Sequence, residues 1–212
     1  MQDLSRFRSP IGAWQRCALV VQSALLLALG CVSCGSGGDD MPPACGPYPA
    51  QQTSPYVLPY QVGQIYLVSQ GNCSSGSHSS GTLVQHAYDF LMPVGTSLIA
   101  ARGGVVLLVE ERFDDGSRTP GQENFVNIVH ADDTIAAYVH LTRDGALVAV
   151  GDVVVQGELI GLSGDTGDSA APHLHFHVQR CAGCETVPLT FRNTRAHPDG
   201  LVEGQQYTAE AF

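Results

Sequence analysis

Short apolar or alternating segments, separated by turn residues, fill most of the chain beyond residue 56. VGQIYLVSQ, GVVLLVEE, NFVNIVHA and TIAAYVHL are examples, and glycine, proline or acidic residues lie between them. Such segments are typical of β-strands, and no stretch keeps apolar residues at the 3.6-residue period of an amphipathic helix. The pattern therefore predicts an all-β fold: a single antiparallel β-sheet or sandwich-like domain over residues 56–212, with few helices.

The segment PHLHFHV, residues 172–178, alternates strictly between two kinds of side chain. In a strand, successive side chains point to opposite faces. One face of this strand is then apolar, as expected of a core. The other face carries three of the eight histidines in the chain: His173, His175 and His177. Histidine nitrogens bind zinc, but an isolated His-x-His also occurs on ordinary packed or exposed strands.

The first 31 residues have the organisation of an export signal. Three arginines precede the apolar run CALVVQSALLLALG, which is short for a membrane span and ends in small residues. We predict a lipoprotein-type signal peptide over 1–31, with lipid on Cys31 or Cys34; plain secretion is the alternative. Residues 32–55, rich in Gly, Pro and Ser, predict a flexible linker. The protein is thus expected in the cell envelope, held to a membrane by an N-terminal lipid.

Composition narrows the choice of partners. The chain has no lysine, and ten arginines against 20 acidic residues give a formal net charge of −10. Because this charge repels phosphate, a nucleic-acid partner is not expected.

Four cysteines beyond Cys34 form an even set, which indicates disulfides in an oxidising compartment. The expected pairs are Cys45–Cys73 and Cys181–Cys184, although the residues alone leave the pairing open. CAGC also suggests a zinc knuckle or redox motif, but no second C-x-x-C lies beyond Cys34.

Two further segments add residues of metal-binding type. HAYDF contains Asp89, and YVHL contains His140. The segments AYDFLMPVGTSLIAARGGVV, AAYVHL, GDVVVQGELIGLSGDTG and PHLHFHV follow one another within residues 70–178. In this order they resemble the lysostaphin/LytM-type zinc endopeptidases of bacterial cell walls. The resemblance implies an all-β peptidase domain that holds one Zn²⁺.

Matched residue by residue, the resemblance implies roles for four side chains. Asp89 and His175 correspond to zinc ligands, and His140 and His173 to catalytic residues. Zinc activates water, but peptide hydrolysis also needs a proton carrier and a group that stabilises the oxyanion. The chain has no HExxH motif to supply a glutamate base. Two histidines outside the ligand set can carry out this work near neutral pH.

Three histidines are not assigned a role by the resemblance. His177 occupies a position that the family does not fix, and we expect a polar residue of the sheet face there. His130 and His197 match no motif and are expected to be ordinary surface residues.

The third zinc ligand departs from the family pattern. A histidine usually stands four residues before the aspartate, where this chain has Gln85. His86 is three residues before Asp89, so a regular strand directs it to the opposite face, unless a β-bulge intervenes. His78, in the loop GSHSSG, can fold back over the strand and resembles a family branch with an upstream histidine ligand. We therefore favour His78 as the ligand, with His86 as the alternative.

The resemblance implies a zinc metalloendopeptidase that hydrolyses peptide bonds in the stem peptides or cross-bridges of peptidoglycan. We expect a monomer whose partner is peptidoglycan. The alternative is a non-catalytic regulator of cell-wall amidases, as in family members that have lost ligands. The presence of Asp89, His140, His173 and His175 argues against that loss. A lipoyl-type hammerhead is excluded because it needs a modifiable lysine.

Overall fold

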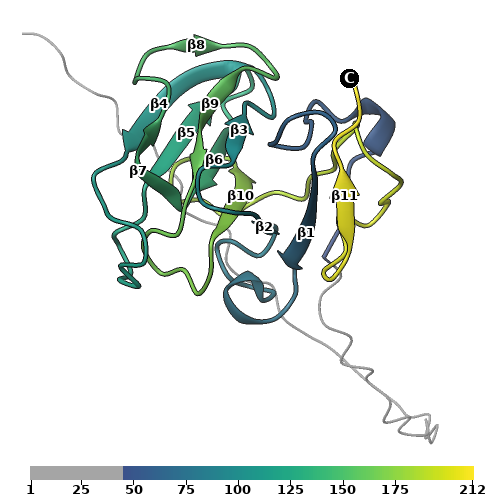
Figure 1. Ribbon diagram of the computed structural model, residues 1–212. Coiled ribbons are helices and arrows are strands. Elements are labelled where there is room, and N and C mark those ends of the chain that lie inside the picture. The colour runs from purple at the N-terminus through teal and green to yellow at the C-terminus, as the bar shows by residue number, and fades with distance from the viewer. Residues whose placement is uncertain (1–44) are drawn as a thin grey trace, which may run out of the picture. The chain divides into compact units, whose positions relative to one another are not determined.

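Two antiparallel sheets make up the part of the chain that the computed structural model describes, residues 45–212. The predicted signal peptide and the first part of the linker lie outside these residues. Helical structure within them is limited to two three-residue 3₁₀ turns, η1 (Gln51–Thr53) and η2 (Gly76–His78). The all-β prediction is confirmed (Figure 1).

The larger sheet has eight strands and the smaller has three. In spatial order the larger sheet consists of β11 (Gln206–Thr208), β1 (Ile65–Gln70), β2 (Tyr88–Leu91), β10 (His173–Gln179), β6 (Ile135–Val139), β5 (Phe125–Val129), β4 (Gly104–Glu110) and β8 (Val153–Val154). The smaller sheet consists of β3 (Ser97–Ile99), β9 (Leu159–Ser163) and β7 (Leu141–Ala146).

Strand β10 lies inside the larger sheet, between β2 and β6. Its apolar residues Leu174, Phe176 and Val178 are fully buried, as their alternation predicts. Leu98 and Ile160 of the smaller sheet belong to the same core, so apolar side chains of both sheets pack together. Each such side chain contributes about 1.5–3 kcal/mol when buried. This burial holds the histidine face of β10 away from the core.

The chain passes from the larger sheet to the smaller one at His140. β6 ends at Val139 and β7 begins at Leu141, and His140 between them has a φ of +66°. A left-handed conformation costs a residue with a Cβ roughly 1–3 kcal/mol, which the surrounding structure must offset. Leu141 is fully buried, and its N–H donates to the carbonyl of Asn124 over 3.1 Å. These contacts hold the strained turn.

Residues 45–55, assigned above to the flexible linker, are attached to the domain. The Cys45–Cys73 disulfide ties their start to the loop between β1 and β2. The side-chain amide of Gln51 donates to the carbonyl of Thr194 over 2.7 Å. The linker prediction is wrong for this segment, because a Gly/Pro-rich composition predicts irregular backbone and not the absence of contacts.

The C-terminal region is irregular up to its last strand. The second disulfide, Cys181–Cys184, closes a turn directly after β10, so both expected pairs are confirmed. β11 then pairs with β1 at the edge of the larger sheet. Within residues 45–212, no helix has the length and apolar character needed to cross a membrane.

Candidate metal centre

Asp89 and two histidines meet on the face of the larger sheet turned away from the core. β2 and β10 pair so that Asp89 stands directly opposite His175. The His175 Nδ1 atom lies 2.9 Å from Asp89 Oδ1. His78, on η2, brings its Nε2 to 3.5 Å from the same oxygen and 3.3 Å from His175 Nδ1. Loop and strands thus bring together the three residues predicted as ligands.

The spacing of these three donor atoms fits a metal ion of the size of zinc. Ligand atoms on a tetrahedral zinc, each about 2.05 Å from the metal, lie roughly 3.3 Å apart. The three separations here run from 2.9 to 3.5 Å. Two imidazoles and one carboxylate, with a fourth position left for water, are also a donor set of catalytic zinc sites. The residues present therefore fit such an ion.

Hydrogen bonds on the far side of each imidazole select the nitrogen that faces the cluster. His78 Nδ1 donates to the carbonyl of Gly71 over 3.1 Å, which leaves Nε2 as its donor atom toward Asp89. His175 Nε2 lies 3.0 Å from His177 Nδ1, which leaves Nδ1 of His175 facing the carboxylate. Such outer partners fix tautomer and ring orientation in metal sites. His177, expected to be a plain polar residue, therefore contacts a candidate ligand.

His140 and His173 stand beside the cluster, with their ring centroids 4.5 Å apart. His140 Nδ1 donates to the carbonyl of Thr166 and His173 Nδ1 to that of Ala171, each over 2.7 Å. Both rings are thereby held in the tautomer whose Nε2 is free to accept a proton. His173 Nε2 lies 3.7 Å from Asp89 Oδ1.

The loop before β10 supports His173 through a chain of side chains that the sequence did not reveal. Ser169 Oγ donates to Asp165 Oδ1 over 2.6 Å and lies 3.3 Å from His173 Nδ1. Arg118 Nη2 holds the other oxygen of Asp165 at 3.2 Å. DTGDSAAP has the composition of an ordinary loop, and no local pattern separates these residues from others of their kind.

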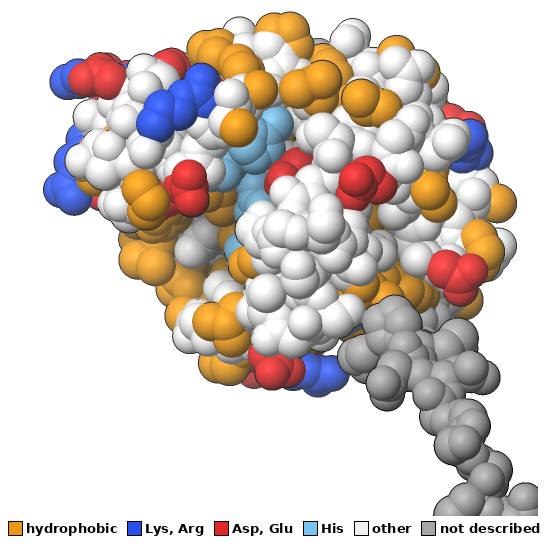
Figure 2. Space-filling view, turned by 90° about the horizontal axis from the view of Figure 1, so that it is seen from below, with side chains coloured by type: hydrophobic (Ala, Val, Ile, Leu, Met, Phe, Trp, Pro, Cys, Tyr) orange, Lys and Arg blue, Asp and Glu red, His pale blue; other side chains and the backbone are white. Residues whose placement is uncertain are grey.

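A cleft of about 340 Å³ opens over the cluster. Asp89, His140, His173 and His175 all line it. Figure 2 shows histidine side chains at the bottom of a hollow in this face, with acidic side chains beside it. Asp89, His175 and the two neighbouring histidines are therefore accessible from solvent, whereas His78 is fully buried and does not line the cleft.

Burial and neighbouring charges shift the pKa values in the cluster. Burial opposes ionisation of Asp89, but the hydrogen bond from His175 and the charges of the surrounding histidines outweigh it, so the pKa of Asp89 lies below its usual value. Burial lowers the pKa of His78, and lowers that of His140 to about 4 with a further contribution from His173. An ionised carboxylate with neutral imidazoles is the protonation state that a divalent metal ion requires.

The family model for peptidase family M23 matches residues 84–188. The chain carries a domain of peptidase family M23. The matched residues include Asp89, His140, His173 and His175, whereas His78 lies before them.

Curated relatives match the M23 domain over part of their length. An uncharacterized metalloprotease of Buchnera aphidicola is 32% identical over 124 residues, 58% of this chain and 30% of the relative. The peptidoglycan DD-endopeptidase ShyA of Vibrio cholerae is 37% identical over 90 residues, 42% of this chain and 19% of the relative. The solved structure of lysostaphin from Staphylococcus simulans has 29% identity and a TM-score of 0.45, and the match covers 60% of this chain and 47% of that one. The chain spans less than a third of the length of the two curated relatives.

The remaining three histidines of the chain, His86, His130 and His197, do not line the cleft. His86 contacts the Cys45–Cys73 disulfide. His130 and His197, expected at the surface, are only 3% and 2% exposed, so that expectation is wrong. His130 Nδ1 donates to a backbone carbonyl over 2.9 Å. Both ring nitrogens of His197 are hydrogen-bonded to the backbone, whereas only Nδ1 of His130 is. The positions of these two histidines in the sequence carry no motif that separates them from surface residues.

Proposed function

We propose that this M23 domain is a zinc metalloendopeptidase that hydrolyses peptide bonds in the stem peptides or cross-bridges of peptidoglycan. The observation that carries the proposal is the close group of His78, Asp89 and His175, with the Nε2 atoms of His140 and His173 beside it in an open cleft. The substrate class is supported by the name of the Vibrio cholerae relative, a peptidoglycan DD-endopeptidase.

In this proposal His78 and His175 hold the metal through Nε2 and Nδ1, and Asp89 through a carboxylate oxygen. A bound zinc ion supplies a Lewis acid and lowers the pKa of water at its open position. The single negative charge of Asp89 would leave a bound divalent ion with net positive charge, which would favour polarisation of a peptide carbonyl.

His140 and His173 then supply the proton transfers and stabilise the oxyanion. Each ring has its Nδ1–H engaged by a backbone carbonyl, so its Nε2 is the atom that takes or gives a proton. When protonated, the same Nε2–H can donate to the oxygen of the tetrahedral intermediate. Two such nitrogens on one side of the cleft can divide these tasks without a glutamate base.

The alternative, a non-catalytic regulator of amidases, is not favoured. A regulator that had lost catalysis would not need to keep three potential ligands and two further imidazoles directed into one cleft. It would also not need Thr166 and Ala171 to hold both Nδ1 atoms.

Zinc content and digestion of purified peptidoglycan test the proposed function together. We expect about one zinc per chain, release of wall peptides, and loss of both after chelation. Asp89→Ala should abolish metal binding and digestion. If a metal-loaded chain leaves sacculi of different cross-bridge types intact but stimulates an added amidase, the regulator is the correct assignment.

We also propose that the chain is exported and anchored in the cell envelope by a lipid on Cys31 or Cys34. The arginine-led apolar run near the N-terminus supports this location, where peptidoglycan is accessible. Mass spectrometry of the native N-terminus tests it: a diacylglyceryl-cysteine is expected. Cleavage that leaves an unmodified, non-cysteine N-terminus would contradict it.

A further inference from the structure

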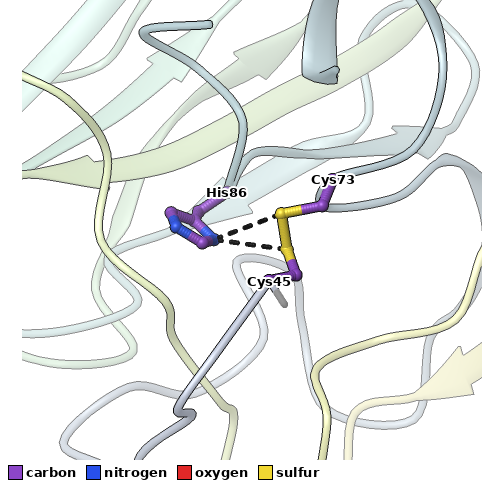
Figure 3. A group of neighbouring side chains, drawn as sticks. All are labelled: Cys45, Cys73 and His86. Carbon is purple, nitrogen blue, oxygen red and sulfur yellow. Dashed lines mark hydrogen bonds between the residues drawn. A yellow bond between two sulfur atoms is a disulfide. The ribbon is translucent and has the colours of Figure 1, made fainter. Parts of the chain in front are cut away.

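Outside the cleft over Asp89, His86 contacts the two cysteines Cys45 and Cys73 (Figure 3). His86 Nδ1 lies 3.7 Å from Cys45 Sγ and 3.9 Å from Cys73 Sγ, and the two sulfurs form a disulfide. The hydroxyl of Tyr48 donates to Cys45 Sγ over 3.0 Å. Polar groups therefore surround this disulfide, unlike one that is buried among apolar side chains.

The imidazole stands where a third ligand would stand on a metal shared with the two sulfurs. A thiolate and an imidazole nitrogen on one tetrahedral zinc lie about 3.6 Å apart, with Zn–S about 2.3 Å and Zn–N about 2.05 Å. The two distances from His86 Nδ1 are within 0.3 Å of that value. Two thiolates on the same ion lie about 3.8 Å apart, which the side chains of Cys45 and Cys73 can reach by rotating once their bond is broken. Their Cα atoms are 5.8 Å apart.

The cluster is open to a reductant and to a metal ion. Cys45, Cys73 and His86 line a cavity of about 200 Å³ together with Gln85 and Ser80. A cavity of this size leaves room for a fourth ligand, water or a side chain. Two thiolates and an imidazole are a donor set that selects zinc and other thiophilic cations over magnesium or calcium.

We propose that Cys45, Cys73 and His86 form a second metal site, for zinc or another thiophilic divalent cation, that becomes available when their disulfide is reduced. A dithiol supplies two electrons and two protons to the disulfide and is itself oxidised to a disulfide. The cation then binds two thiolates, and the two thiol protons are released to solvent. The site is separate from the Asp89 cluster, and its occupancy depends on the redox state.

The other disulfide provides the internal contrast. Cys181 and Cys184 also lie near each other, but no His, Cys, Asp or Glu among the described residues offers a third ligand atom that completes a group with them. Reduction of the Cys181–Cys184 disulfide therefore yields two thiols with no imidazole beside them to act as a third ligand. The proposal therefore predicts a difference between two disulfides of one chain.

The test compares zinc binding by the full chain before and after its disulfides are reduced with a phosphine. The phosphine is oxidised to a phosphine oxide with oxygen from water, and each disulfide becomes two thiols. Wild type should bind about one further zinc when reduced, and Cys181→Ser/Cys184→Ser should keep this gain. Cys45→Ser/Cys73→Ser should lose it. His86→Ala should lower the affinity for this additional zinc by at least about tenfold. Loss of a residue that only supports a ligand already costs roughly that much, and His86 is proposed as a ligand itself. Cysteines outside the described residues are present in wild type and in every variant, so any zinc that they bind contributes equally to each measurement.

A second measurement uses unmodified protein, so it does not depend on the folding of variants. Reduced chain is alkylated with and without zinc, and the labelled cysteines are identified by mass spectrometry. Zinc should protect Cys45 and Cys73 together, and bound cobalt(II) should show sulfur-to-metal charge transfer. The proposal is overturned if reduction adds no metal, if the gain survives in Cys45→Ser/Cys73→Ser, or if zinc leaves both cysteines open to alkylation.

Discussion

His78 and His86 are eight residues apart in the sequence, yet they belong to two different clusters. His78 faces the carboxylate of Asp89 and the imidazole of His175, both of which line an open cleft. His86 faces two sulfurs that are bonded to each other. In one cluster the donor atoms are available to a metal ion, and in the other a covalent bond occupies them. The comparison shows that the chemistry of a histidine here is decided by its neighbours.

The backbone explains why two nearby histidines separate in this way. His78 lies on η2 in a Gly/Ser-rich loop, and this loop folds over the strand that carries Asp89. His86 lies in the turn two residues before β2, and its N–H donates to Thr186 Oγ1 over 3.0 Å. That contact and the turn hold His86 beside the Cys45–Cys73 disulfide and away from Asp89. No bulge between His86 and Asp89 is needed.

The largest expected effect separates the two clusters by metal binding. His78→Ala should lose the zinc of the Asp89 cluster and all measurable hydrolysis, because two of three protein ligands remain. His86→Ala should keep both in the oxidised chain. Zinc stoichiometry and affinity, measured on the two variants side by side, check this. Retention of zinc in His78→Ala with loss in His86→Ala would reverse the assignment.

The next effect separates ligands from catalytic residues within the Asp89 cluster. His140→Ala and His173→Ala should keep zinc but lower turnover by roughly 10²–10⁴-fold, the usual contribution of general acid–base catalysis. Zinc analysis and peptidoglycan digestion on the same preparations check it. His175→Ala serves as the matched control from the same strand and should lose the metal. Loss of metal in His173→Ala instead would show that the two roles are exchanged.

A smaller effect is expected at His177, which contacts the centre only through His175. His177→Phe removes the nitrogen that orients His175 and should weaken zinc affinity by about 10–100-fold. His177→Asn places an oxygen or nitrogen near the position of Nδ1 and should restore most of that affinity. Competition with a chelator of known affinity measures both. Equal weakening in the two variants would indicate a role in packing alone.

The smallest effect concerns a histidine that belongs to neither cluster. His197 Nε2 accepts from the Phe191 N–H over 2.9 Å, and its Nδ1 donates to the Arg195 carbonyl over 2.8 Å, so the neutral ring is fully bonded. Burial lowers its pKa below the ordinary 6.5. A lowered pKa means that the unfolded chain binds the proton more readily. The stability contributed by His197 is therefore present above about pH 6.5 and is lost as the pH falls toward the folded-state pKa.

Urea unfolding at neutral and mildly acidic pH measures this effect. The midpoint of wild type should fall more on acidification than that of His197→Gln, whose side-chain oxygen can accept from Phe191 without titrating. An identical fall in the two proteins would assign the acid sensitivity to other groups.

The local sequence pattern was sufficient to predict the strands and the histidine-bearing face of β10, which forms one side of the candidate metal centre. The alternation of PHLHFHV predicts β10, its buried apolar face and the shared face of its histidines, because side-chain direction in a strand depends only on the parity of the position. The even number of cysteines beyond Cys34 also indicated disulfides, and the structure gives their pairing. The M23 motifs, present in order, indicated the family for the same reason: they are local segments.

Tertiary structure alone decided which residues from separate segments meet. The pairing of Asp89 with His175, the return of His78 over β2 and the contact of His86 with the disulfide depend on loop closure and sheet register. The burial of His197 depends in the same way on contacts with distant parts of the chain. Composition could not reveal that residues 45–55 are attached to the domain, since a Gly/Pro-rich segment can be irregular and still be packed. These features rest on contacts between residues far apart in the chain, and the free energy of such contacts is absent from any local pattern.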